Sequence, residues 1–127
     1  MDLNGISRKV IGCGIEVHKQ LGPGLLESTY EHCLAYELQL SGIHVERQKV
    51  LPVLYKDVHL DCGYRLDLLV EGELIVELKA VDKLLPIHEA QVLTYLKLSQ
   101  KRLGLLMNFN EKLLMNGVRR LVNNFIE

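Results

Sequence analysis

Near the N-terminus, apolar and small residues recur at the spacing of a helix. Four such positions stand at i, i+4, i+7 and i+11: Val10, Gly14, Val17 and Leu21. Residues at these intervals share one side of a helix, so the pattern predicts a helix over residues 7–21 with one buried side. The sequence Gly-Pro-Gly that follows favours a sharp turn at the end of this helix.

Two further helices are predicted from periodicity and end signals. Apolar residues repeat every four positions over residues 26–40, and Gly42 suits the left-handed backbone that commonly ends a helix. Pro86 suits the first turn of a third helix, because proline has no N–H to leave unpaired there. We expect this helix to cover residues 86–99.

The remaining apolar segments are short and typical of strands. The predicted strands cover residues 43–51, 53–60 with a turn near Lys56, 62–70, 74–81 and 102–109, and the last of these is predicted to be buried. Residues 116–122 fit either a final strand or a short helix, and periodicity leaves both open. The order is two helices, four strands, a helix, a strand and a tail, which predicts an α/β fold with a mixed sheet flanked by helices.

Composition is typical of an ordinary globular domain. With 127 residues, 48 % of them hydrophobic, we expect one domain over residues 1–127. No apolar run approaches the about 20 residues that span a bilayer, and no signal-peptide pattern is present. The three cysteines are odd in number and widely spaced, which favours a reducing cytoplasm over a disulfide framework. Zinc bound by Cys13 and His18 with His32 and Cys33 is an alternative, but no Cys-x-x-Cys pair supports it.

The candidate chemistry lies on the hairpin formed by residues 62–70 and 74–81. From position 65 to position 79 the even-numbered residues of both arms are apolar, and the odd-numbered positions hold every charge. A loop of three residues sets odd positions opposite odd ones, whereas a two-residue loop would mix the two faces. We therefore expect a three-residue loop, with Asp67, Glu77 and Lys79 on one face. The opposite face would then carry Leu66, Leu68, Leu74, Val76 and Leu78.

Two explanations account for two carboxylates beside a lysine on this face. The structural one is an ion pair in which Lys79 neutralises Asp67 or Glu77. The functional one is a divalent cation held by Asp67, Glu77 and the backbone carbonyl of Leu78, since such hard oxygen ligands suit Mg²⁺, with Mn²⁺ also possible. Lys79 would then position or activate a water, or stabilise charge on a reacting phosphate.

These motifs resemble those of a known group of enzymes. Asp67, followed after nine residues by Glu-Leu-Lys at 77–79, resembles the signature of the PD-(D/E)XK nuclease superfamily. Residues 24–30 match the Gly-x-x-Glu-x-x-Tyr motif of the GxxExxY family, a small bacterial and archaeal family within that superfamily. The sequence His-Glu-Ala-Gln at 88–91 is also similar to that family, and the resemblance covers about residues 6–122.

The resemblance implies a restriction-endonuclease-like core and a set of site residues. It implies metal ligands at Asp67 and Glu77, a catalytic lysine at Lys79, a helix-borne acid at Glu27 and a supporting glutamine at Gln91. Read from the residues alone, Glu27 also fits the positive end of a helix dipole, and Gln91 a hydrogen bond to backbone. The activity implied is Mg²⁺-dependent hydrolysis of phosphodiester bonds in nucleic acid, DNA rather than RNA.

Three neighbouring residues are expected to have structural roles. Tyr30 lies on the apolar stripe of the second helix and should enter the core. Tyr95 is expected to pack against the sheet, as buried tyrosines commonly do. His88 stands at a helix start with nothing in the sequence to orient it, so we expect it to be exposed.

A non-enzymatic module that binds nucleic acid or assembles with partners is the rival hypothesis. The net charge of −1 and the few aromatic residues favour it, whereas the complete set of acidic residues favours the enzyme. We also expect a homodimer, because a duplex has two strands and one small site cuts one of them. The apolar strand 103–109 and the tail near Leu121 and Phe125 would supply the surface.

Overall fold

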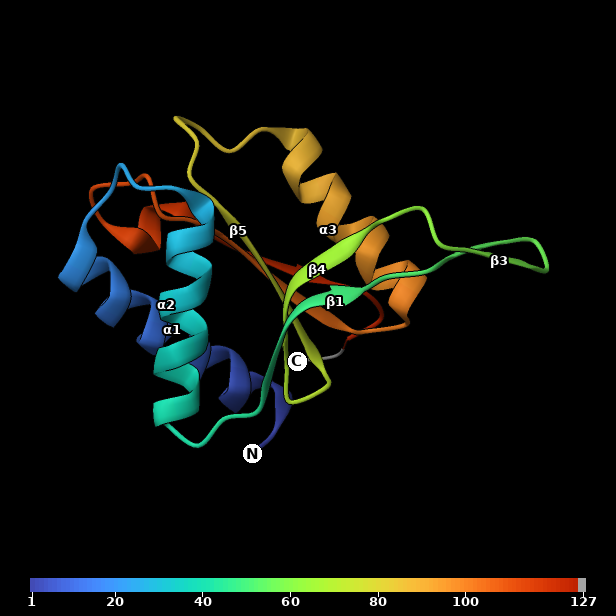
Figure 1. Ribbon diagram of the computed structural model, residues 1–127, viewed down its shortest axis with the longest axis horizontal. Coiled ribbons are helices and arrows are strands. Elements are labelled where there is room, and N and C mark those ends of the chain that lie inside the picture. The colour runs from blue at the N-terminus through green and yellow to red at the C-terminus, as the bar shows by residue number, and fades with distance from the viewer. Residues whose placement is uncertain (126–127) are drawn as a thin grey trace.

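The computed structural model describes residues 1–125 and shows a five-stranded mixed sheet with helices on both faces (Figure 1). The helices are α1 (Leu3–Leu21), α2 (Glu27–Leu40), α3 (Pro86–Ser99) and the short 3₁₀ helix η1 (Leu114–Gly117). The sheet strands are β1 (Val45–Val50), β4 (Arg65–Val70), β5 (Leu74–Lys79), β6 (Leu103–Asn108) and β7 (Val118–Val122). This is the predicted mixed α/β architecture, and it is consistent with a restriction-endonuclease-like fold.

The strand order in the sheet is β1-β4-β5-β6-β7. Neighbouring strands are antiparallel except β5 and β6, which run parallel because α3 carries the chain back across the sheet. Strands β2 (Val53–Tyr55) and β3 (Val58–Leu60) pair only with each other. They form a ribbon that projects from the body of the molecule between β1 and β4 (Figure 1).

Helix α1 begins four residues before the predicted position, because Asp2 caps it. The Asp2 carboxylate accepts a hydrogen bond from the Gly5 N–H at 2.8 Å, and this satisfies one of the unpaired donors of the first turn. The helix packs closely on the sheet at Gly14, where an added Cβ would lie 2.6 Å from the Met107 Cε. The glycine in the apolar stripe therefore permits a close approach of α1 to β6.

Two hydrophobic cores lie on opposite faces of the sheet. The larger one joins the sheet to α1 and α2, and within it the Tyr30 ring stacks on Phe109 at 4.6 Å between centroids. The smaller core joins the sheet to α3 and includes Val92, Tyr95 and Leu96. The expectation that Tyr30 and Tyr95 pack inside the protein is confirmed.

The hairpin of β4 and β5 has the predicted three-residue loop. Val70 pairs with Leu74, and Leu68 pairs with Val76, so even positions face even positions. Leu68, Leu74, Val76 and Leu78 pack in the larger core as expected. Leu66 is an exception: it packs in the smaller core, with Leu69 and Ile75. This change of face lies next to a gap in the pairing of β1 with β4, where Gln48 and Asp67 stand opposite each other without pairing.

Two expectations for the C-terminal third have definite outcomes. Residues 114–117 form a 3₁₀ turn and residues 118–122 a strand, so both alternatives for this segment are realised in succession. The expected dimer surface on 103–109 is wrong. This segment is buried throughout, because β6 has a strand on each side and a core on each face. Among residues 1–125, none of the helices has the length and apolar character needed to cross a membrane.

Candidate active site

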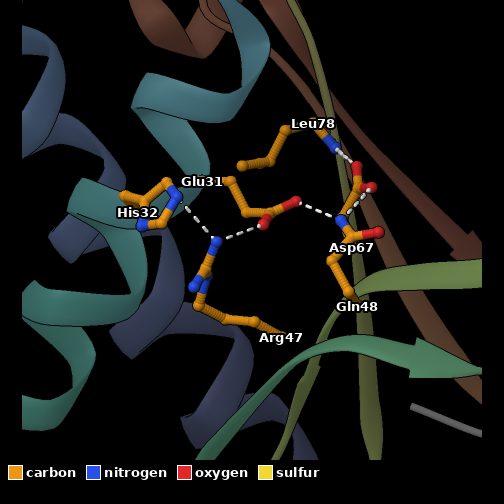
Figure 2. A network of polar contacts seen from close by, with 6 residues as sticks. All are labelled: Glu31, His32, Arg47, Gln48, Asp67 and Leu78. Atoms are coloured by element: carbon orange, nitrogen blue, oxygen red, sulfur yellow. Dashed lines mark hydrogen bonds and ion pairs between the residues drawn. The ribbon is translucent and has the colours of Figure 1, made fainter.

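Asp67 and Glu77 meet where β4 and β5 stop pairing through their backbones. The last backbone pair on this side is Leu68 with Val76, and the next two residues in register are Asp67 and Glu77. Beyond this point, side-chain oxygens accept hydrogen bonds from the backbone N–H groups. Glu77 Oε2 accepts from the Asp67 N–H at 2.7 Å, and Asp67 Oδ2 accepts from the Leu78 N–H at 2.8 Å. Figure 2 shows the contact between Asp67 and Leu78. The two carboxylates therefore lie together, as the odd-numbered pattern of the hairpin predicts.

Burial and mutual repulsion disfavour the charged forms of both acids. Glu77 is only 4 % exposed, and burial followed by the charge of Asp67 raises the pKa of Glu77 to about 8. Burial also raises the pKa of Asp67, and the charges of Glu31 and Glu27 add to this effect, although the Leu78 N–H opposes it. Two adjacent acids with raised pKa values are electrostatically unfavourable unless a cation or a proton joins them.

Lys79 stands close to this pair without contacting it. The residue is half-buried at the end of β5, and its backbone oxygen accepts a hydrogen bond from the Phe109 N–H at 2.9 Å. Its positive charge lowers the pKa of Asp67 and of Glu77, yet its ammonium makes no ion pair or hydrogen bond with any residue of the range 1–125. The structural ion pair that the sequence left open is therefore absent from the described residues.

A third acid, Glu31, was not predicted to belong to this site. It lies on α2 one turn after Glu27 and is 6 % exposed. Its Oε1 accepts from Gln48 Nε2 at 2.6 Å and its Oε2 accepts from Arg47 at 3.0 Å, and the same Gln48 nitrogen lies 3.4 Å from Asp67 Oδ1 (Figure 2). One feature of the sequence could have identified Glu31: it is a charged residue between Tyr30 and Leu34, on the side of α2 that packs into the core.

The comparison with protein families agrees with this geometry. A family profile described as the PD-(D/E)XK nuclease superfamily matches residues 4–121, which include every strand of the sheet except the end of β7. The chain belongs to the PD-(D/E)XK nuclease superfamily. No curated protein and no solved structure gives a significant match. Nucleases of this superfamily generally use divalent metals such as Mg²⁺ and act on nucleic acid.

Two further residues that the superfamily resemblance implied, Glu27 and Gln91, make no direct contact with the two acids. Glu27 is exposed in the first turn of α2, and its charge raises the pKa of Asp67. It lines a hollow of about 510 Å³ together with Leu25, Leu26, Ser28 and Ala80. Gln91 is half-buried on α3. Neither Glu27 nor Gln91 makes a side-chain hydrogen bond within residues 1–125, so the structure does not bring them into contact with the two acids.

The rest of the Gly-x-x-Glu-x-x-Tyr motif shapes the loop before α2. The Tyr30 hydroxyl donates to the Gly22 carbonyl at 2.7 Å and accepts from the Leu25 N–H at 3.0 Å. Gly24 has φ +99°, a conformation that L side chains rarely adopt. Tyrosine and glycine therefore hold the loop, and Glu27 is left as the exposed polar group of the motif.

His88 has a role that the sequence did not reveal. The expectation of an exposed and unoriented histidine is wrong, because the residue is half-buried and its Nδ1 accepts a hydrogen bond from the Leu85 N–H at 2.9 Å. The interaction satisfies a backbone donor at the start of α3. His88 therefore caps the helix that covers the smaller core.

The donor atoms of the site fit a hard divalent cation. Within residues 1–125 there is no group of three or more His, Cys, Asp or Glu arranged to hold a metal, so the candidate donor set is two carboxylates and the Leu78 carbonyl. Glu77 Oε1 accepts no hydrogen bond, and no buried side-chain oxygen of the described residues lacks a partner, so Oε1 reaches solvent. Such an incomplete oxygen set suits Mg²⁺, which usually keeps several waters and binds substrate phosphates.

Proposed function

We propose that this protein hydrolyses phosphodiester bonds of nucleic acid, DNA in preference to RNA, in a Mg²⁺-dependent reaction. The observation that carries the proposal is the pair of adjacent, raised-pKa carboxylates Asp67 and Glu77 beside Lys79, whose ammonium has no partner among residues 1–125. A divalent cation would relieve the repulsion between the two acids, and phosphate oxygens would complete its coordination. Membership of the nuclease superfamily supports this chemistry.

Each residue of the site has a proposed role. Asp67, Glu77 and the Leu78 carbonyl would hold Mg²⁺ or Mn²⁺, which when bound polarises a phosphate and lowers the pKa of a coordinated water. Lys79 would orient the attacking water or stabilise the negative charge that develops on the phosphate. Glu27 and Gln91 would act on the substrate or on water, because neither forms a hydrogen bond with the carboxylates.

A cleavage assay tests the proposal. Single-stranded, double-stranded and closed circular DNA, and RNA, would be incubated with the protein in Mg²⁺, in Mn²⁺ and in EDTA. We expect cleavage of DNA with either metal and none with EDTA, and the circular substrate separates endonuclease from exonuclease action. Absence of cleavage, together with absence of divalent-cation binding by calorimetry, would contradict the proposal.

The alternative is a module that binds nucleic acid without cutting it. The net charge of −1 and the absence of tryptophan leave few groups for phosphate contacts and base stacking, which favours weak or assisted binding over processive action. A gel-shift measurement in Ca²⁺ or EDTA detects binding separately from cleavage. Binding that persists in Mg²⁺ with intact substrate would support this alternative over hydrolysis.

We also propose a homodimer, with a surface different from the one that the sequence suggested. The projecting β2–β3 ribbon exposes three large apolar side chains on one face: Tyr55, Val58 and Leu60. They share this face because Tyr55 pairs with Val58, and Leu60 pairs with Val53 two residues before Tyr55. A two-stranded ribbon has no core of its own, and an exposed apolar group of this kind is typical of an interaction surface.

Light scattering at tens of micromolar should report twice the 14.5 kDa mass of the chain. A Tyr55→Ser, Val58→Ser double variant should become monomeric, because these two residues are opposite each other on one face of the ribbon. Tyr36→Ser, at an exposed site on α2, should leave the mass unchanged and serves as the control. A wild-type protein that is monomeric at this concentration would refute the dimer.

Three broader assignments are proposed on the same basis. Gly24, Glu27 and Tyr30 support membership of the GxxExxY family within the superfamily. The packing of α1, α2 and α3 on one sheet supports a single domain over residues 1–127. The free cysteines, of which Cys62 is exposed, support a reducing cytoplasm, where an accessible thiol stays reduced.

A further inference from the structure

Gln48 interrupts an otherwise regular pair of strands. Its φ is +52° in the middle of β1, a left-handed conformation that is unfavourable for a residue with a side chain. The neighbouring residues pair normally with β4, Arg47 with Leu68 and Lys49 with Leu66, but the position between them does not. Backbone strain of this kind persists only where surrounding interactions hold it, and it is concentrated at functional sites.

The side chain of Gln48 joins two carboxylates that come from different elements. Its Nε2 donates to Glu31 Oε1 at 2.6 Å and lies 3.4 Å from Asp67 Oδ1 (Figure 2). A carboxylate can only accept hydrogen bonds, so Glu31 forces the NH₂ group of Gln48, and not its carbonyl, to face inward. Arg47 holds Glu31 in place through the ion pair at 3.0 Å.

We propose that Gln48 is a positioning residue that fixes the orientation of the Asp67 carboxylate for binding of a divalent cation. This inference rests on the proposed metal-dependent function. The Leu78 N–H holds Asp67 Oδ2, and the Gln48 amide holds Oδ1, so the carboxylate is restrained at both oxygens. Each oxygen keeps a second lone pair for a cation. Hydrogen bonds of this kind around a ligand tune metal affinity.

A simple tether between α2 and β1 does not account for the geometry. Arg47 already joins the two elements through Glu31, and it does so from a position that pairs regularly with β4. The left-handed backbone at Gln48 therefore adds one contact that the Arg47–Glu31 ion pair does not make: the Gln48 side chain approaches Asp67. Gln48 is itself an exposed residue, so its replacement removes no core packing.

Two variants separate positioning from structure. Gln48→Asn and Gln48→Gly both tolerate a left-handed backbone, but neither has a side chain long enough to reach from Glu31 to Asp67. We expect the affinity for Mn²⁺ or Mg²⁺, measured by calorimetry without nucleic acid, to fall by about 10- to 100-fold in both. Both variants lose the hydrogen bond to Glu31, so the melting temperature of the metal-free protein should fall slightly, and less in Gln48→Gly because the strain is relieved.

Matched controls are available in the same chain. Gln100 also has a left-handed backbone, φ +58°, at the end of α3, so Gln100→Gly relieves the same strain away from the acids and should leave metal affinity unchanged. Glu31→Gln removes the charge that orients Gln48 and should also weaken metal binding. Glu46→Gln makes the same change in the pair that Glu46 forms with Lys49, and it should have no effect.

A second measurement uses the Mg²⁺ dependence of cleavage. Gln48→Asn should need more Mg²⁺ for half-maximal rate and approach the wild-type rate at saturating Mg²⁺. A purely structural role would lower the melting temperature but leave the Mg²⁺ concentration at half-maximal rate unchanged. If the wild-type protein binds metal and cleaves nucleic acid, and both Gln48 variants bind metal with the same affinity as the wild type, this inference alone is overturned. Wild-type protein that binds no divalent cation would overturn the proposed function and this inference together.

Discussion

Replacement of Lys79 by arginine should lower the cleavage rate by about 10² or more, a typical scale for a positioned acid–base or electrostatic group. Alanine should have an effect of the same size. The reason is that the Lys79 ammonium is held near two carboxylates without contacting them, so its role depends on its position and not on charge alone. Arginine keeps the charge, but its planar group is longer, differently directed and effectively never deprotonated.

Single-turnover rates at saturating Mg²⁺ measure this effect on a substrate that the wild-type protein cuts. Lys83→Arg, an exposed lysine four residues later, is the matched control and should retain the wild-type rate. Metal affinity should survive in both Lys79 variants, and loss of the nearby cation in Lys79→Ala should tighten it. Near-full cleavage by Lys79→Arg would reduce the residue to a counter-ion for the acids.

Glu77→Gln should abolish measurable Mg²⁺ or Mn²⁺ binding. Glutamine is a better test than alanine, because Glu77 is buried and truncation would leave a cavity, whereas the glutamine oxygen can still accept from the Asp67 N–H. Glu77→Ala should also abolish binding. Glu73→Gln, at an exposed position of the hairpin loop, makes the same change outside the site and should bind metal normally. Unchanged affinity of Glu77→Gln by calorimetry would refute the role of Glu77 as a ligand.

The same variant should alter the pH dependence of stability in the metal-free protein. The pKa of Glu77 is about 8 in the folded protein, against about 4.3 for an unperturbed glutamate. Between these values the folded state keeps a proton that the unfolded state has released, so the free energy of unfolding falls as pH rises and levels off above the folded pKa. The raised pKa of Asp67 acts in the same direction.

Urea denaturation in EDTA, from pH 5 to pH 8.5, measures this slope, and Glu77→Gln should flatten it. Metal affinity should rise over the same range, because a cation must displace the proton that the raised pKa keeps on Glu77. A wild-type free energy of unfolding that is constant across this range would contradict the raised pKa of Glu77.

Local features of the sequence were sufficient to predict most of the secondary structure and the position of the two acids. Helix periodicity, the glycines and Pro86 placed the three helices, because these signals act within a few residues of the chain. The odd-numbered charges of the hairpin predicted a three-residue loop, since only that loop keeps apolar positions opposite apolar ones. The adjacency of Asp67 and Glu77 follows from the same parity.

Only the tertiary structure decided which residues surround those acids. Glu31 and Gln48 come from α2 and β1, and they reach Asp67 through packing of these elements against β4. The backbone conformation of Gln48 has no sequence signal, because contacts with distant residues maintain it.

The position of each strand in the sheet was decided by the tertiary structure. The prediction of a buried strand near 103–109 is confirmed, but its use as a dimer surface is wrong, because the strand order places it between β5 and β7. Leu66 packs in the smaller core and not with Leu68, next to the unpaired position of Gln48 and Asp67. Hydrophobic periodicity records which residues avoid water, but it does not say which element covers them, and only long-range packing decides that.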